Sequence, residues 1–103
     1  MIPLKIDFQE GFQNDEVVVR IDGKEVFRAD NVTTKLTIGL AGSFTKEIPL
    51  GKHEVEVFLP RRDVSRNLAL YLAEKPLYLG VHLRNGTQYP IEYCVSAEPF
   101  GYC

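Results

Sequence analysis

The segment from Leu77 to Val95 constrains the fold most strongly, because it reads as two β-strands around an Asn-Gly pair. Asn85 and Gly86 both tolerate the positive φ of tight hairpin turns, and the flanking runs are aliphatic, aromatic and β-branched. A three-residue loop, 84–86, would leave one face apolar throughout, with Gly86 left-handed in a bulge. This register pairs Leu83 with Thr87, Val81 with Tyr89, Leu79 with Ile91 and Leu77 with Tyr93.

Elsewhere the chain alternates apolar and polar residues, as half-buried strands do. The expected strands are 4–8, 16–21, 24–28, 33–40, 44–48, 53–59, 68–73, 77–83 and 87–95. Within 33–40 we expect Leu36, Ile38 and Leu40 to face inward, and we expect a polar loop at 60–67. Strands this short, separated by frequent turn signals, predict an all-β fold. It would be a single antiparallel β-sandwich or small barrel of eight to nine short strands.

Composition is that of an ordinary globular domain, with 103 residues, 45% hydrophobic and 25% charged. We expect one all-β domain over 1–95 and a C-terminal tail over 96–103. The net charge of −2 is too small to predict steering toward nucleic acid or an anionic membrane. The N-terminus shows no basic segment followed by an apolar core, so a cytoplasmic location is expected, with an extracytoplasmic one left open. The longest apolar-rich span, 68–83, is interrupted by Glu74, Lys75 and Pro76, so no membrane span is expected.

The sequence lacks the usual motifs of catalysis and metal binding. It contains no nucleophile elbow, no phosphate loop and no dinucleotide fingerprint. Glu54 and Glu56 fall on one face of a predicted strand, where a solvated surface is the ordinary outcome for such a pair. The metal candidates are His53, His82, Cys94 and Cys103, and they show no ligand spacing. We therefore expect no cofactor and no metal site. Two free thiols, an intramolecular pair and an intermolecular bridge all remain open for Cys94 and Cys103.

Two surfaces are candidates for binding. The first is a polar and aromatic sheet face, on which tyrosines could anchor a sugar or a protein; its residues are Tyr71, Tyr78, His82, Gln88 and Glu92. The second is the loop that carries Arg61, Arg62 and Arg66, where guanidinium groups could hold a phosphate or carboxylate. Asp63 lies among these arginines, and the alternative for this loop is a solvated segment with an internal ion pair.

Residues 19–26 (Val-Arg-Ile-Asp-Gly-Lys-Glu-Val) and 48–57 (Ile-Pro-Leu-Gly-Lys-His-Glu-Val-Glu-Val) form a hairpin and a following strand. This segment resembles PEGA-type and related transthyretin-like small β-sandwich modules, although the Pro-Glu-Gly triplet is absent. The resemblance covers less than half of the chain. It implies a noncatalytic structural or binding module, often extracytoplasmic, and it makes His53 the first residue of a strand rather than a ligand.

These observations favour a noncatalytic β-sandwich that binds or assembles through its tyrosine-bearing sheet face or its C-terminal tail. The expected partner is another protein or a second copy of this chain, as in a homodimer. The alternative is a small-ligand or anion binder that uses the loop from Arg61 to Arg66, and an enzyme in a small barrel is the third interpretation. Nucleic acid is not an expected partner.

Overall fold

The computed structural model describes residues 1–101, which form eight strands and one short 3-10 helix. The strands are β1 (Ile2–Phe8), β2 (Asp15–Ile21), β3 (Lys24–Val32), β4 (Gly42–Ile48), β5 (Gly51–Leu59), β6 (Val64–Leu72), β7 (Leu77–Leu83) and β8 (Ile91–Ser96). The helix η1 (Pro60–Arg62) connects β5 to β6. The predicted all-β fold class is confirmed.

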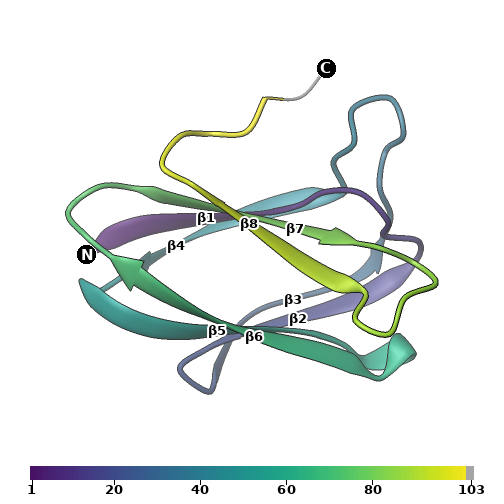
Figure 1. Cartoon of the computed structure of the whole chain (residues 1–103), viewed down its shortest axis with the longest axis horizontal. Coiled ribbons are helices and arrows are strands. Elements are labelled where there is room, and N and C mark those ends of the chain that lie inside the picture. The colour runs from purple at the N-terminus through teal and green to yellow at the C-terminus, as the bar shows by residue number, and fades with distance from the viewer. Residues whose placement is uncertain (102–103) are drawn as a thin grey trace.

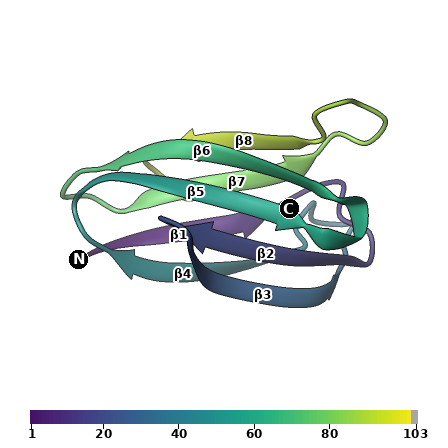
Figure 2. The ribbon, with the colours of Figure 1, turned by 90° about the horizontal axis from the view of Figure 1, so that it is seen from below.

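The strands form two four-stranded sheets, in the orders β4-β1-β7-β8 and β3-β2-β5-β6. The sheets lie one above the other as a sandwich (Figure 1), and Figure 2 looks onto the outside of the β3-β2-β5-β6 sheet. They do not close into a barrel. All strand pairs are antiparallel except β1 and β7, which run parallel. After β6 the chain enters the β4-β1-β7-β8 sheet at the same end as β1 begins, so β7 runs in the direction of β1. The sandwich is therefore mostly, not wholly, antiparallel.

Alternation along the strands places the apolar side chains between the sheets. Val17 and Val19 of β2 and Val55 and Val57 of β5 are fully buried, as the pattern predicts. At the side of the sandwich formed by β3 and β4, Phe27 stacks on Phe44 with ring centroids 4.3 Å apart. Phe8, Phe12 and neighbouring rings continue this aromatic cluster. The core is thus sealed by aromatic rings at the β3/β4 side.

The prediction of a strand over 33–40 is wrong. Only Lys35 and Leu40 pair, as an isolated bridge, and the residues between them form a turn that stands above the sandwich (Figure 1). Leu36 is 94% exposed and does not face inward. Gly39 has a φ of 68°, and the amides of Ile38 and Gly39 both donate to the Lys35 carbonyl, so the backbone turns back on itself. The backbone of this segment hydrogen-bonds within the turn itself instead of pairing with a neighbouring strand.

The predicted register of the β7–β8 hairpin is also wrong. Leu83 pairs with Ile91, not with Thr87, and the Arg84 amide donates to the Pro90 carbonyl across a seven-residue loop, 84–90. The faces of the strands are as expected, since the slip is an even number of residues. Ile91 is 2% exposed, but Tyr89 is 73% exposed instead of packing on β7. Gly86 is left-handed, with a φ of 82°, inside the longer loop.

Sheet pairing also extends into the predicted loop at 60–67. β6 begins at Val64 and pairs with β5 over nine residues without interruption. Only Pro60–Arg62 and the left-handed Asp63 remain as a connection.

Candidate functional site

A groove lies at the side of the sandwich where β6 and β8 are the last strands of their sheets. We call it the β6/β8 groove; Figure 1 faces this side of the molecule. Its volume is about 810 Å³. Its lining residues are Asp63, Val64, Ser65, Arg66, Asn67, Gln88, Tyr89, Pro90, Ile91 and Glu92. One wall therefore comes from the start of β6 and the other from the 84–90 loop and the start of β8.

Arg66 and Tyr93 join the two walls at the inner end of this groove. The Tyr93 hydroxyl donates to the Arg66 carbonyl at 2.5 Å, and the Arg66 guanidinium donates to the Ile91 carbonyl at 2.8 Å. The guanidinium also lies 5.8 Å from the centre of the Tyr93 ring, within the range of a cation–π contact. Burial raises the pKa of Tyr93, so its hydroxyl stays protonated and acts as a donor. These contacts join β6 to β8 across the two sheets.

The predicted polar and aromatic face is only partly assembled. His82 and Glu92 face each other across β7 and β8, with Nε2 and Oε1 2.8 Å apart, and Arg84 binds the second Glu92 oxygen at 3.0 Å. Gln88 lies in the groove wall. Tyr78 shares the outer face of this sheet with His82, because the two positions are four residues apart on β7.

Tyr71 does not join that face. It belongs to β6 in the other sheet, and its side chain is 74% exposed. Because Leu70 and Leu72 point into the core, Tyr71 points away from it on the outside of the second sheet. Tyr71 and Tyr78 therefore lie on opposite outer faces of the sandwich and cannot form one aromatic surface.

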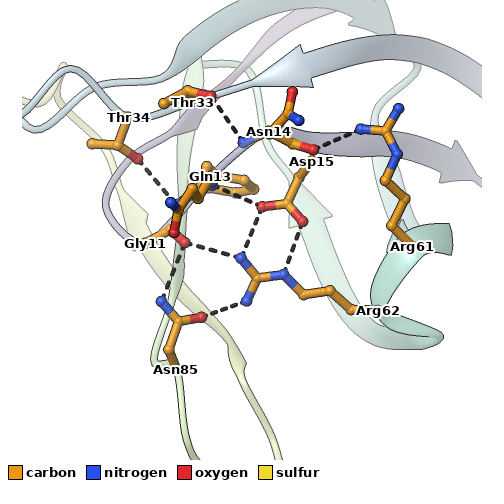
Figure 3. Close-up of polar contacts among 10 residues, drawn as sticks. Gly11, Gln13, Asn14, Asp15, Thr33, Thr34, Arg61, Arg62 and Asn85 are labelled. Carbon is orange, nitrogen blue, oxygen red and sulfur yellow. Dashed lines mark hydrogen bonds and ion pairs between the residues drawn. The ribbon is translucent and has the colours of Figure 1, made fainter.

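The three arginines of the predicted anion loop bind different partners instead of converging. Arg62 grips the buried Asp15 carboxylate with two hydrogen bonds of 2.8 Å, and it also donates to the Asn85 side chain and the Gly11 carbonyl (Figure 3). Arg61 donates to the Asn14 carbonyl and pairs with an exposed carboxylate, that of Asp30. Among these arginines only Arg66 lines the groove.

The Asp15–Arg62 pair ties together the end of the sandwich beside the groove. Asp15 is 2% exposed and also accepts a hydrogen bond from the Gln13 amide. Through Arg62 it connects the start of β2 to η1 and to Asn85 of the 84–90 loop. A bidentate pair of this kind fixes orientation as well as charge. One wall of the groove is therefore held by an ion pair between a buried carboxylate and a half-buried guanidinium.

His53 forms a second polar clasp, away from the groove. Its Nδ1 lies 2.6 Å from Asp22 Oδ2, and its Nε2 lies 2.8 Å from the Pro49 carbonyl oxygen. Both neighbours are acceptors, so the geometry favours the doubly protonated ring. The Asp22 hydrogen bond raises the pKa of His53, while the Glu54 amide and His53 lower the pKa of Asp22. This clasp joins the β2–β3 turn to the start of β5.

The outside of the β3-β2-β5-β6 sheet carries a layer of ion pairs. Arg20 binds Glu56 at 2.8 Å and lies over the Phe58 ring, and Arg28 binds Glu16 at 2.7 Å. Val18 beneath them is fully buried. Glu54, the other carboxylate singled out on this strand, accepts a hydrogen bond from Asn67. The carboxylates Glu16, Glu54 and Glu56 on this face are therefore all paired with side chains of the same sheet.

Residues 1–101 contain no cluster of three or more His, Cys, Asp or Glu side chains able to hold a metal ion. Cys94 is an exposed free thiol on β8, whereas Cys103 lies outside the described residues, as does the end of the predicted tail. Within the described part of the chain, no helix is long and apolar enough to cross a membrane.

Compared with protein-family models, curated proteins and solved structures, the chain matches none of them. The resemblance to PEGA-type and transthyretin-like modules therefore stays a prediction. The sequence did not predict the groove as such, because the expected register put Tyr89 in the core and the expected loop included Val64 to Asn67. Three predicted candidates, Arg66, Gln88 and Glu92, nevertheless line it. A further signal was Pro90, which lacks an N–H and so favours the end of a strand or a sheet edge.

Proposed function

We propose that the protein is a noncatalytic binding module that takes up an extended polypeptide segment along the edge of β6. Side chains of that segment would enter the β6/β8 groove. The observation that carries this proposal is the groove itself, between edge strands of two different sheets. Addition of a strand to an open edge is a recurring mode of peptide recognition, in which the main chain supplies affinity and pockets for alternate side chains supply specificity.

The groove has the mixed lining that such a segment needs. Val64 and Pro90 offer half-buried apolar surface, Gln88 offers a hydrogen-bonding amide, and Tyr89 supplies an exposed ring. Tyrosines with one free face are common anchors of binding surfaces. Glu92 in the same wall is already paired with Arg84 and His82, so the groove does not present it as an isolated charge.

The alternative function, anion binding through the arginine loop, keeps one candidate in the groove. Arg66 uses one guanidinium nitrogen on Ile91, and the hydrogen bonds within residues 1–101 give its other nitrogens no partner. A carboxylate on the bound segment could occupy this position. Arg61 and Arg62 bind carboxylates of the chain itself, so an acidic side chain of a peptide fits the geometry better than a free phosphate held by three arginines.

The test is a selection of random dodecapeptides on display against the protein at low concentration, followed by titration of the enriched peptides. Two variants are compared: Ala69→Lys adds a charge to the β6 edge, and Ser43→Lys adds the same charge to an exposed residue of β4. We expect the enriched peptides to bind the Ala69→Lys protein about tenfold more weakly, or roughly 1.4 kcal/mol. They should bind the Ser43→Lys protein as they bind the wild type.

Amide chemical-shift mapping should place the bound peptide along β6 and the 84–90 loop. Equal binding to both lysine variants, shifts confined to another face, or a selection that enriches no peptide would each overturn the proposal. Circular dichroism and thermal melting of both variants establish that the comparison is between folded proteins.

A further inference from the structure

The edge of β6 differs from the other three sheet edges in its lack of protection. β6 is nine residues long, pairs with β5 without a register shift, and carries one charged residue, Arg66. Asn67 to Leu72 (Asn-Leu-Ala-Leu-Tyr-Leu) contains neither a charge nor a proline. Among the described residues, the hydrogen bonds that join β6 to β8 all involve Arg66, so this second half of β6 makes none to β8.

The other edges show the devices by which proteins prevent unwanted strand pairing. β3 carries Lys24, Glu25, Arg28 and Asp30, and two register shifts interrupt its pairing with β2. β4 carries Lys46 and Glu47. β8 has only six residues, follows a proline and carries a charged Glu92. An unprotected edge on a chain that protects the rest suggests an edge used for pairing.

We propose that the segment taken up by β6 is the β6 strand of a second copy of this chain, paired antiparallel around Leu68. This inference rests on the proposed function, since it names the occupant of the same edge. Centring on Leu68 pairs all nine residues of each strand, with Val64 opposite Leu72 of the second copy. The β3-β2-β5-β6 sheets of the two copies then form one continuous sheet across a twofold axis, which is a closed, isologous arrangement.

The charges of β6 fit this register. Arg66 lies opposite Leu70 of the second copy, so the two arginines are never directly opposed and no like charges meet across the pair. On the outer face, Tyr71 lies opposite Ser65, and Asn67 lies opposite Ala69. A large exposed ring thus meets a small residue, which leaves room for Tyr71 to cover its neighbour. Self-pairing therefore opposes no like charges and, on the outer face, no two large side chains.

The experiment combines sedimentation velocity with directed cross-linking of the full chain. We expect a concentration-dependent dimer for the wild type and for Ser43→Lys, and about tenfold weaker association for Ala69→Lys, or roughly 1.4 kcal/mol. In the Ala69→Lys dimer the two lysines would sit diagonally across the pair and repel each other. For cross-linking, Leu68→Cys and the control Ser43→Cys are made with Cys94 and Cys103 replaced by serine. Only Leu68→Cys should give a covalent dimer on mild oxidation.

The outcomes separate this inference from the proposed function. A wild type that stays monomeric at high concentration while peptides selected on it still bind along β6 would overturn the dimer and leave the binding module. A dimer that Ala69→Lys does not weaken, equal cross-linking at positions 68 and 43, or open-ended oligomers would also overturn the dimer. A monomer to which no peptide binds would overturn both proposals.

Discussion

The two sides of the sandwich, where the edge strands of the two sheets meet, are held together by different interactions. At the β3/β4 side, Phe27 and Phe44 stack at 4.3 Å and join a cluster of aromatic rings that seals the core. At the β6/β8 side, hydrogen bonds of Tyr93 and Arg66 bridge the sheets at one point, and a groove remains beside them. Apolar packing fills space, whereas a single polar bridge fixes a spacing and leaves room. The first side stabilises the fold, and the second is available for binding.

Truncation of the aromatic side should have the largest effect on stability. Phe27→Ala removes a ring that stacks on both Phe8 and Phe44, and we expect it to lower the free energy of unfolding by about 3 kcal/mol. Tyr89→Ala on the groove side, where the ring is 73% exposed, should change it by less than about 0.5 kcal/mol. Urea denaturation of both variants measures the difference. Similar losses would show that the two sides contribute equally to the core.

Disruption of the half-buried Asp15–Arg62 ion pair beside the groove should have the next largest effect. Arg62→Lys keeps the charge but loses the bidentate hydrogen bonds to Asp15, so we expect the free energy of unfolding to fall by about 2 kcal/mol. It should also alter the amide shifts of the 84–90 loop, because Arg62 binds Asn85. The control is Arg61→Lys, whose carboxylate partner is exposed, with an expected change below about 0.5 kcal/mol. Equal losses for the two lysine variants would contradict the structural role of Arg62.

The polar bridge of the groove side is tested by Tyr93→Phe. Loss of the hydroxyl leaves the Arg66 carbonyl and the Val57 amide without this contact, and we expect a cost of about 1 kcal/mol. Tyr71→Phe, at an exposed position, serves as the matched control and should leave stability unchanged. If Tyr93→Phe is as stable as the wild type, the groove is held open by packing alone and not by the bridge.

The smallest effect should come from pH, through the His53–Asp22 clasp, and it should leave both sides of the sandwich unaffected. Because the folded pKa of His53 is raised, its stabilisation is complete below the ordinary value of 6.5 and is lost as pH rises through the higher folded value. The pKa of Asp22 is lowered, so its stabilisation is present above 3.8 and is lost as pH falls through the lower folded value. Stability from the clasp is therefore greatest between these two ordinary values.

We expect the melting temperature of the wild type to fall from pH 6 to pH 8, and His53→Gln should flatten this fall while the half-buried pair of His82 and Glu92 stays intact. The measurement is differential scanning calorimetry across this range. An unchanged pH profile in the variant would show that His53 does not contribute the titrating group.

Much of the fold could be predicted from local patterns. Alternation identified β2 and β5 and their inward valines, because a half-buried strand needs an apolar residue at every second position. The same rule failed at 33–40, where the pattern was present but no neighbouring strand lay beside it. It also predicted the faces of β7 and β8 correctly and their register wrongly, because a slip of an even number of residues preserves the faces.

The groove depends on which strands end each sheet, and alternation carries no information about strand order. From Leu77 to Val95, the sequence by itself determined two strands, their inner faces and a left-handed Gly86. Only the tertiary structure decided that the 84–90 loop lies beside the start of β6, that Arg62 turns inward to Asp15, and that Tyr71 and Tyr78 face apart. The physical reason is that periodicity reports burial along one strand, whereas a site between two sheets depends on contacts between residues distant in the chain.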